Sequence, residues 1–399
     1  MKSKIIYISS IDLTNYNSKI FGVNYLRNKN INVEYWYSHF IYKIKKKPKD
    51  IVNLSFKKTI DSIYEFKKRI YKEKSNSTVV ILLLNLDYRS IEIYKTIKKL
   101  NIKSVSFLWD LDPTVDDKPK NLLNKAYKKF FQKISYKEYF SIIYSFIKIR
   151  IYKYLNFIKD SEITFYTGSI AKNILKKRTK SKLVGLNSND NDRLLESRNK
   201  KRIIKNKKYC VFLDSAMTSR DHIDKYIFGE KDMAGLHVSY FRSLKKFFLK
   251  VEKKYKIKTV ISRHPKSKFN IKKYLNRPVY DYKSPELVKD AEFVICHQSL
   301  SLNYAILLNK PVIFIYTQKM LDRSNATINL VNNIKLFAKI LGQNVLNIDK
   351  NFILPEKNEL KPNRKKYNLH KKNYLLVNNN QEIYSKKIFY KNLIAILNK

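Results

Sequence analysis

Two short polar clusters in the second half of the sequence carry residue types that can bind a nucleotide phosphate. The tripeptide Arg263-His264-Pro265 follows the apolar run 259–262, and the pentapeptide 297–301, His-Gln-Ser-Leu-Ser, follows the apolar run 292–296. Short apolar runs that alternate with helical segments are typical of strands in a parallel sheet. Because ligands of such sheets bind beyond the carboxyl ends of the strands, the spacing predicts part of a nucleotide site at these two clusters.

The first cluster suits a phosphate leaving group. His264 can donate a hydrogen bond to a phosphate or ribose oxygen, Arg263 adds positive charge, and Pro265 fixes the turn that aims the imidazole. The alternative interpretation of His264 is a structural histidine in a turn. We favour the ligand interpretation because two polar clusters follow neighbouring strands.

The second cluster precedes a predicted helix at 302–308. The hydroxyls of Ser299 and Ser301, with the first N–H groups of that helix, would form an anion site, whereas plain helix capping is the alternative. His297 and Gln298 are further candidates for contacts with the base or ribose. Glu286 opens another helical piece, where it could hold a ribose hydroxyl or simply complement the helix dipole.

The elements that must position these clusters form two α/β sheets. Strands are predicted at 4–9, 31–37, 78–84, 104–109, 163–166, 182–186, 209–213, 259–262, 292–296 and 312–316. Helices are predicted at 19–28, 54–73, 88–100, 238–255, 286–291, 302–308 and 383–397, and the tail 353–379 is predicted to be irregular. A chain of 399 residues exceeds one compact core. We therefore expect one domain at 1–200, a second at 209–375 after a polar linker, and a closing helix at 380–399.

The composition is strongly basic, with a formal net charge of +50. Such a charge invites a nucleic-acid-binding interpretation, but the charge comes mostly from scattered lysines and no known nucleic-acid-binding module is present. We therefore predict no nucleic-acid partner and expect the positive surface to favour anionic membranes. The two cysteines, Cys210 and Cys296, lie in apolar runs without metal-ligand neighbours and are predicted to be buried. The absence of a signal peptide or an apolar span predicts a cytoplasmic, peripheral location.

The segment 120–160 differs from the rest because it combines many aromatic residues and lysines with a single acidic residue before Asp160, namely Glu138. A basic amphipathic helix with aromatic residues is typical of an interfacial membrane anchor. An ordinary helix pair packed on the first sheet, with solvated lysines, explains the pattern equally well. Both interpretations stay open at this point.

The turn Asp110-Leu111-Asp112-Pro113 ends a predicted strand of the first domain. Two carboxylates at this spacing could do acid/base work. A helix cap is the more common use of such a turn, and we favour it.

Several motifs occur in an order that resembles a known enzyme group. They are Phe212-Leu213-Asp214, a Ser-Leu-x-x-Phe-Phe helix, Arg263-His264-Pro265, Glu286-Leu287-Val288-Lys289-Asp290, Ser299-x-Ser301 and Asn309-Lys310-Pro311. The segment 209–317 thereby resembles bacterial surface-polysaccharide glycosyltransferases of the GT-B type. More narrowly, it is similar to the bacterial sialyltransferase and polysialyltransferase group. The family's carboxylate-carboxylate-Gly motif departs here to Asp214-Ser215-Ala216, with one carboxylate and no glycine.

The resemblance implies a GT-B fold, with two Rossmann-like domains facing a central cleft. The first domain would bind a glycan or glycolipid acceptor, and the second a CMP-linked sugar such as sialic acid or Kdo. Transfer would be inverting, with no metal and no cofactor. Asp214 would be the base, with Asp110 in reserve, and His264 would contact the leaving phosphate. A CDP-glycerol or CDP-ribitol phosphotransferase is the alternative enzyme.

Overall fold

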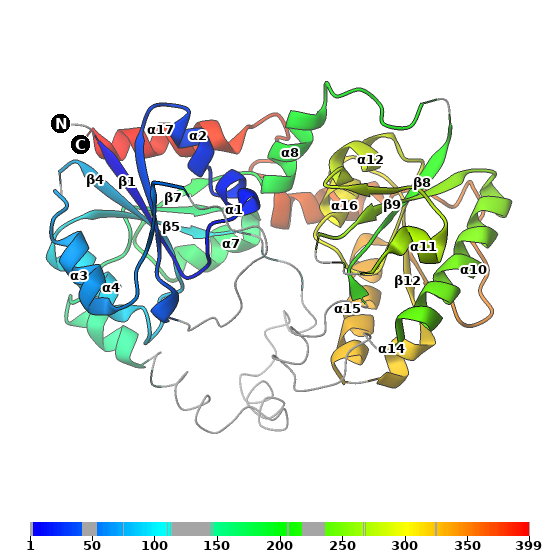
Figure 1. Ribbon diagram of the computed structural model, residues 1–399, viewed down its shortest axis with the longest axis horizontal. Coiled ribbons are helices and arrows are strands. Elements are labelled where there is room, and N and C mark those ends of the chain that lie inside the picture. Colours follow the sequence, from blue (N-terminus) through cyan, green and yellow to red (C-terminus); the bar gives the residue numbers. More distant parts are fainter. Residues whose placement is uncertain are drawn as a thin grey trace. The chain divides into compact units, whose positions relative to one another are not determined.

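The computed structural model describes residues 3–41, 54–74, 76–109, 111, 113, 144, 147–205, 207–217, 236–265, 267, 269–323 and 325–398. These residues form two compact units (Figure 1). The first unit contains the described residues up to Leu111, those from 144 to Asn187, and those from Ile383 onward. The second contains Ser188–Glu382. The polar run 198–208, where the sequence places the linker, lies inside the second unit.

The first unit is built on a parallel sheet in the order β3-β2-β1-β4-β5-β6-β7. Its strands are β1 (Lys4–Ser9), β2 (Asn32–Tyr37), β3 (Lys57–Thr59), β4 (Thr78–Leu83), β5 (Lys103–Leu108), β6 (Ile163–Tyr166) and β7 (Lys182–Gly185). Its helices are α1 (Asn15–Ile20), α2 (Val23–Arg27), η1 (His39–Ile41), α3 (Ile63–Ile70), α4 (Ile91–Lys99), α7 (Gly168–Lys176) and α17 (Ser385–Leu397).

The second unit repeats this organisation with the strand order β10-β9-β8-β11-β12-β13, again parallel throughout. Its strands are β8 (Tyr209–Leu213), β9 (Lys258–Arg263), β10 (Val279–Asp281), β11 (Val294–Cys296), β12 (Val312–Tyr316) and β13 (Asn344–Asn347). Its helices are α8 (Asn189–Ser197), α10 (His237–Tyr255), α11 (Ile271–Leu275), α12 (Ser284–Asp290), α13 (Leu302–Leu307), α14 (Gln318–Arg323), α15 (Asn325–Leu341), α16 (Arg364–His370) and η4 (Lys371–Leu375).

Both strand orders are those of a doubly wound Rossmann sheet. Renumbered from the first strand of each unit, they read 3-2-1-4-5-6, with a seventh strand added in the first unit. This confirms the predicted fold class, two Rossmann-like α/β domains. The topology also fixes where a ligand is expected in the second unit. After β8 the chain turns to β9 on one side and later returns to β11 on the other, so the ends of β8 and β11 flank the topological switch point.

Alternation along β1 shows why its sheet is covered on both faces. Ile5 and Tyr7 join one buried cluster, which includes Phe389 of α17, whereas Ile6 and Ile8 join another. Successive side chains of a strand point to opposite faces, so an uninterrupted apolar run implies burial on both. Helices α3 and α4 lie together on one side of this sheet, and α2 and α17 lie on the other (Figure 1).

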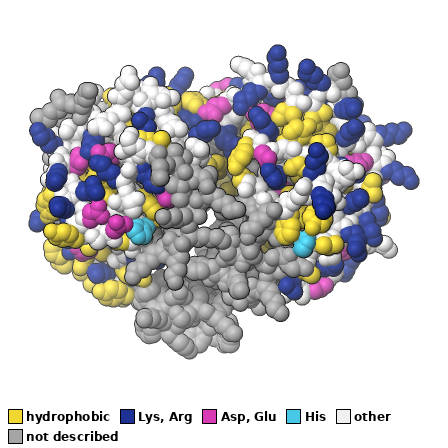
Figure 2. All heavy atoms as spheres, in the orientation of Figure 1, with side chains coloured by type: hydrophobic (Ala, Val, Ile, Leu, Met, Phe, Trp, Pro, Cys, Tyr) yellow, Lys and Arg dark blue, Asp and Glu magenta, His cyan; other side chains and the backbone are white. Residues whose placement is uncertain are grey.

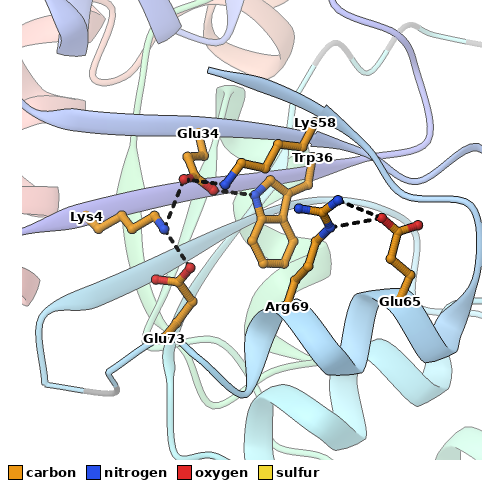
Figure 3. Close-up of polar contacts among 7 residues, drawn as sticks. All are labelled: Lys4, Glu34, Trp36, Lys58, Glu65, Arg69 and Glu73. Carbon is orange, nitrogen blue, oxygen red and sulfur yellow. Dashed lines mark hydrogen bonds and ion pairs between the residues drawn. The ribbon is translucent and has the colours of Figure 1, made fainter. Parts of the chain in front are cut away.

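A polar cluster near the amino ends of β1 and β2 completes the first unit. Glu34 accepts hydrogen bonds from Trp36 Nε1 (2.7 Å) and Lys58 Nζ (2.7 Å), and it lies 3.1 Å from Lys4 Nζ (Figure 3). Lys4 also bonds Glu73, at 2.6 Å. Burial of Glu34 opposes ionisation, but the donors from Lys58, Trp36 and Lys4 outweigh it and lower the pKa of this carboxyl. The cluster therefore ties β1, β2, β3 and the turn after α3, which contains Glu73, together.

Some secondary-structure predictions were wrong. The predicted helix 54–73 contains the short strand β3 before α3, and the tail predicted as irregular contains α16 and η4. The short strands β10 and β13 were also not predicted. Cys210 and Cys296 are both buried, as predicted, and burial raises the pKa of Cys210 to about 12. Asp110, Asp112 and most of the segment 120–160 lie outside the described residues.

Candidate functional site

Asp214 stands directly after β8 and joins two loops. Its carboxylate accepts hydrogen bonds from the backbone N–H of Ala216 (Oδ1, 2.9 Å) and from the backbone N–H of His264 (Oδ2, 3.1 Å). The backbone N–H of Asp214 in turn donates to the carbonyl of Ser262, at 3.0 Å. Only 6% of Asp214 is exposed. The side chain thus fastens the end of β8 to the turn after β9.

Ser215 makes the corresponding link on the other side of β8. It is fully buried, and its Oγ donates to the carbonyl oxygen of Gln298 (2.8 Å), which follows β11. The loops after β8, β9 and β11 are therefore held together by Asp214 and Ser215. These three strands are adjacent in the sheet, and the Ser215–Gln298 bond crosses the switch point. The expectation that the two predicted clusters follow neighbouring strands is wrong, because β8 lies between β9 and β11. Both clusters nevertheless lie at the same carboxyl edge, on either side of β8, where a Rossmann-like sheet binds its ligand.

The loop after β9 presents His264, which is half-buried, and Pro265, which is exposed. The backbone N–H of Ser267 donates to the carbonyl of His264 at 2.9 Å and closes the turn. Arg263, the last residue of β9, is held by Asp281 of β10 in a bidentate pair with both distances 2.6 Å. The hydrogen bonds with Asp281, with weaker help from the charges of Asp214 and Tyr282, raise the pKa of Arg263. Arg263 therefore joins the ends of β9 and β10.

Ser299 and Ser301, both half-buried, differ in their local roles. The Oγ of Ser299 accepts a hydrogen bond from the backbone N–H of Ser301, at 3.3 Å, which is a local capping contact. Ser301 is the N-cap residue of α13, yet its side chain makes no capping hydrogen bond. Because α13 has only six residues, its few aligned peptide dipoles contribute little to anion binding. The hydroxyls, more than the helix, carry the anion-binding potential of this loop.

Glu286 lies in the first turn of α12 and is buried. Its Oε1 pairs with Lys200 Nζ at 2.8 Å, whereas no described group of the protein hydrogen-bonds its Oε2. Burial by itself would raise the pKa of Glu286, but the hydrogen bond from Lys200 outweighs this and lowers it. Glu286 is thus an ionised carboxylate with one oxygen still able to accept a hydrogen bond.

His297 is a structural residue. It is fully buried, its Nδ1 contacts the carbonyl of Ile315 (2.5 Å), and its Nε2 contacts the hydroxyl of Tyr240 (2.8 Å). A carbonyl can only accept, so Nδ1 carries the hydrogen, and Nε2 of the neutral ring accepts from Tyr240. The suggested contact of His297 with the base or ribose of a nucleotide is therefore wrong, because both ring nitrogens are paired inside the fold.

Two further residues at this edge escaped the sequence analysis. Ala216 has φ 51° and Tyr282, after β10, has φ 56°, both in the left-handed region that side chains with a Cβ disfavour. Ala216 occupies the position where the related motif has glycine, which was a readable signal. Tyr282 gave no signal because β10, the strand it follows, was not predicted. In the described part of the chain, no group of three or more His, Cys, Asp or Glu residues could hold a metal ion.

No protein-family model matches the sequence, and no curated protein sequence matches it either. Solved structures do match in overall organisation. The UDP-GlcNAc 2-epimerase from Methanocaldococcus jannaschii is 15% identical with a TM-score of 0.48, covering 99% of this chain and 100% of that one. The glycosyltransferase SnogD from Streptomyces nogalater is 9% identical, with a TM-score of 0.45 and 100% of both chains covered. The wall teichoic acid polymerase TagF is 11% identical, with a TM-score of 0.46 over 99% of this chain and 88% of that one. The two Rossmann-like domains are assigned from the strand order of the two sheets alone.

Proposed function

We propose that this protein is a nucleotide-sugar-dependent glycosyltransferase whose donor binds at the carboxyl edge of β8, β9 and β11. One observation carries the proposal. Asp214 and Ser215 bring the His264 loop and the Gln298–Ser301 loop together at the switch point of a Rossmann-like sheet. Such an edge is where nucleotide ligands of this fold bind, and the residues gathered here are donors suited to a phosphate.

The donor we propose is a CMP-activated sugar of the sialic-acid or Kdo kind, transferred with inversion and without a metal to a glycan acceptor in bacterial surface-polysaccharide synthesis. The motif resemblance supports this choice, and we propose the following roles within it. His264 and the hydroxyls of Ser299 and Ser301 donate to the leaving phosphate, with Gln298 beside them. Glu286, in the first turn of α12, is the proposed contact of a ribose hydroxyl. Arg263 acts indirectly, by holding β9 against β10.

In this reaction the acceptor hydroxyl attacks the anomeric carbon, the bond to the CMP phosphate oxygen breaks, and a base takes the hydroxyl proton. Asp214 remains the predicted base, with Asp110 in reserve. Both oxygens of Asp214 already accept a backbone N–H, although each has a second lone pair. The two hydrogen bonds support a role for Asp214 in clamping the loops, and its role as a base needs a separate test.

Nucleotide binding tests the proposal directly. The full chain is screened by thermal shift and calorimetry against CMP, CDP, UDP and GDP, and CMP is expected to give the largest shift. A ligand at about 100 times its Kd stabilises by about 2.7 kcal/mol, which is several degrees in Tm. The double substitution Ser299→Ala/Ser301→Ala should lose the CMP shift, whereas His39→Ala in the first unit should keep it. If none of the four nucleotides binds, the proposal is wrong, and selective CDP binding would favour the phosphotransferase instead.

We also propose that the enzyme works at an anionic membrane surface, which it contacts through residues 147–157 of the first unit. Residues 147–154 are helical, and exposed apolar side chains recur along this segment at Ile147 (51%), Ile151 (47%), Tyr154 (90%) and Leu155 (51%). The spacing of three and four places them on one face. Hydrophobic side chains gather at the lower left edge of this unit in Figure 2, where α3, α4 and this helix lie in Figure 1.

Lysine side chains lie beside the aromatic rings of Tyr144 and Tyr152 in this segment, as in an interfacial membrane anchor. Lys148 Nζ lies 5.3 Å from the ring of Tyr144 and 5.6 Å from that of Tyr152, and Lys95 Nζ of α4 lies 5.1 Å from Tyr152. Cationic and aromatic side chains over an apolar stripe favour an anionic bilayer surface. None of the helices that the structure describes is long and apolar enough to cross a bilayer.

Liposome co-sedimentation tests this surface. Binding to vesicles with anionic lipid is expected to fall with Ile151→Glu/Tyr154→Glu. Leu249→Glu, at an exposed leucine of α10 in the second unit, is the matched control and should bind like the wild type. Equal recovery with neutral and anionic vesicles would contradict the proposal.

A further inference from the structure

Tyr282 is an exposed aromatic residue in an unfavourable backbone conformation. Its φ is 56°, in the left-handed region where a bulky side chain is an outlier. Its side chain is 64% exposed, so the ring returns little burial energy to offset the strain. A residue that costs backbone strain and contributes little to the core suggests a role outside folding.

The neighbouring contacts hold Tyr282 in this conformation. Asp281, directly before it, forms the bidentate pair with Arg263, and both distances are 2.6 Å. Two residues later, Ser284 Oγ lies 2.8 Å from Ser262 Oγ. The first contact joins the last residue of β10 to β9, and the second joins Ser284, which follows β10, to β9. The backbone of Tyr282 is thus fixed from both sides, which is the condition for a strained residue to persist.

The register of the sheet places Tyr282 at the nucleotide edge. Asp281 of β10 pairs with Arg263 of β9, so Tyr282 is level with His264. β10 is two strands from β8, a separation of about 10 Å at the usual strand spacing. A nucleotide whose phosphate lies near the switch point between β8 and β11 would extend its base along the strand ends toward β10. Every nucleobase has a face that stacks on an aromatic ring.

We infer that Tyr282 is the stacking platform for the base of the bound nucleotide, and that Arg263, Asp281 and the Ser262–Ser284 contact position it. This inference rests on the proposed nucleotide site. It adds a residue that sets the affinity for the base and that no motif resemblance marks. It also explains why Arg263 is committed to Asp281, since that pair fixes the backbone on which the ring is displayed.

The test separates strain from stacking by measuring stability and affinity in the same variants. Tyr282→Asn removes the ring and fits the left-handed backbone better, because Asn tolerates φ > 0. We expect its Tm to be unchanged or higher, while the Kd for CMP rises on the order of tenfold or more. Tyr282→Phe keeps the ring and should bind CMP within about twofold of the wild type.

Lys256→Asn is the matched control. Lys256 has φ 52° and is exposed, but it ends α10 just before β9 begins, at the opposite edge of the sheet. Its substitution relieves the same kind of strain, so Tm should not fall, and the Kd for CMP should be unchanged. Ribose 5-phosphate, which lacks a base, provides a second control. Its affinity, measured by competition with CMP, should change little in Tyr282→Asn.

The outcomes distinguish the two proposals. If the wild type binds CMP and Tyr282→Asn binds it equally well, the stacking role is wrong while the nucleotide site stands. An equal loss of affinity for CMP and ribose 5-phosphate would also overturn stacking. If the wild type binds no nucleotide, the proposed function itself fails and the inference fails with it.

Discussion

Two carboxylates, the partly buried Glu34 in the first unit and the buried Asp214 in the second, accept hydrogen bonds from different kinds of donor. Glu34 accepts from three side chains, those of Lys58, Trp36 and Lys4, and every donor belongs to the same sheet (Figure 3). Asp214 accepts from two backbone N–H groups, those of Ala216 and His264. The first arrangement strengthens a sheet. The second determines the shape of the loops that follow β8 and β9.

Backbone strain follows the same division. Among the described non-glycine residues with positive φ, those of the first unit are all asparagines: Asn30, Asn101 and Asn156. Asparagine tolerates this conformation. In the second unit three other residue types adopt it, and two of them, Ala216 and Tyr282, stand at the carboxyl edge of the sheet. The third of these residues, Lys256, lies at the opposite edge of the sheet, so two of the three lie where the nucleotide site is proposed.

The largest expected effect is that of His264→Ala on turnover. The loss should be on the order of 10²-fold or more if the imidazole donates to the leaving phosphate. Stability should change little, because Asp214 contacts the backbone N–H of His264, which alanine retains. Steady-state kinetics with a CMP-sugar donor, alongside chemical denaturation, measures both quantities. His39→Ala is the control, and unchanged turnover in His264→Ala would remove His264 from the site.

Asp214→Asn comes next and separates a clamp from a base. Asparagine removes the basicity of Asp214 but cannot keep both of its hydrogen bonds. Both carboxylate oxygens accept a backbone N–H, and an amide can accept at only one position. The substitution should cost about 1–3 kcal/mol of stability and weaken nucleotide binding as well as turnover. Lower turnover with unchanged denaturation midpoint and unchanged nucleotide Kd would instead identify Asp214 as a base without a clamp role.

Sequence patterns predicted the central strands well because those strands are buried on both faces. β1, β4, β8 and β12 are continuous apolar runs, and the predicted bounds of each differ from the structure by at most one residue. The edge strands β3, β10 and β13 have only three or four residues and partly exposed side chains, so they carry no comparable periodicity. Missing β10 had a consequence, since Tyr282 could not be placed at the edge of the sheet.

The candidate site was predicted in composition but not in its internal bonding. His264, Ser299 and Asp214 were placed at strand ends from apolar runs and turn residues alone. That Asp214 would bond the backbone of His264, 50 residues away, depends on the order of strands in the sheet. Several strand orders are compatible with the same alternating pattern of strands and helices. The hydrogen-bond partner of Arg263 could not be predicted for a different reason. Asp281 lies on β10, and that strand was not predicted.

Glu34→Gln tests whether the Glu34 cluster is purely structural. Removing the charge from a partly buried carboxylate with three donors should cost about 1–2 kcal/mol at neutral pH. Because the pKa of Glu34 is lower in the folded state than in the unfolded one, its contribution is present above the unfolded value, near 4.5, and is lost as pH falls through the folded value. The stability gap between wild type and variant should therefore close in acid. Denaturation of wild type and variant at several pH values measures this stability difference. A change in CMP affinity in Glu34→Gln would contradict a purely structural role for Glu34.

The smallest effect expected is a gain of stability from Ala216→Gly. Ala216 is buried and has φ 51°, where an L-residue is strained and glycine is not. Relief of that strain is partly offset by the greater entropy of glycine in the unfolded chain, so the net gain should be below about 1 kcal/mol. CMP affinity should not fall, because Asp214 bonds the backbone N–H of residue 216 whichever side chain it carries. Ala171→Gly inside α7 is the matched control, and there the same change should cost about 1 kcal/mol. If both substitutions destabilise the protein to the same extent, Ala216 is not strained, and the loop after β8 does not differ in strain from the rest of the fold.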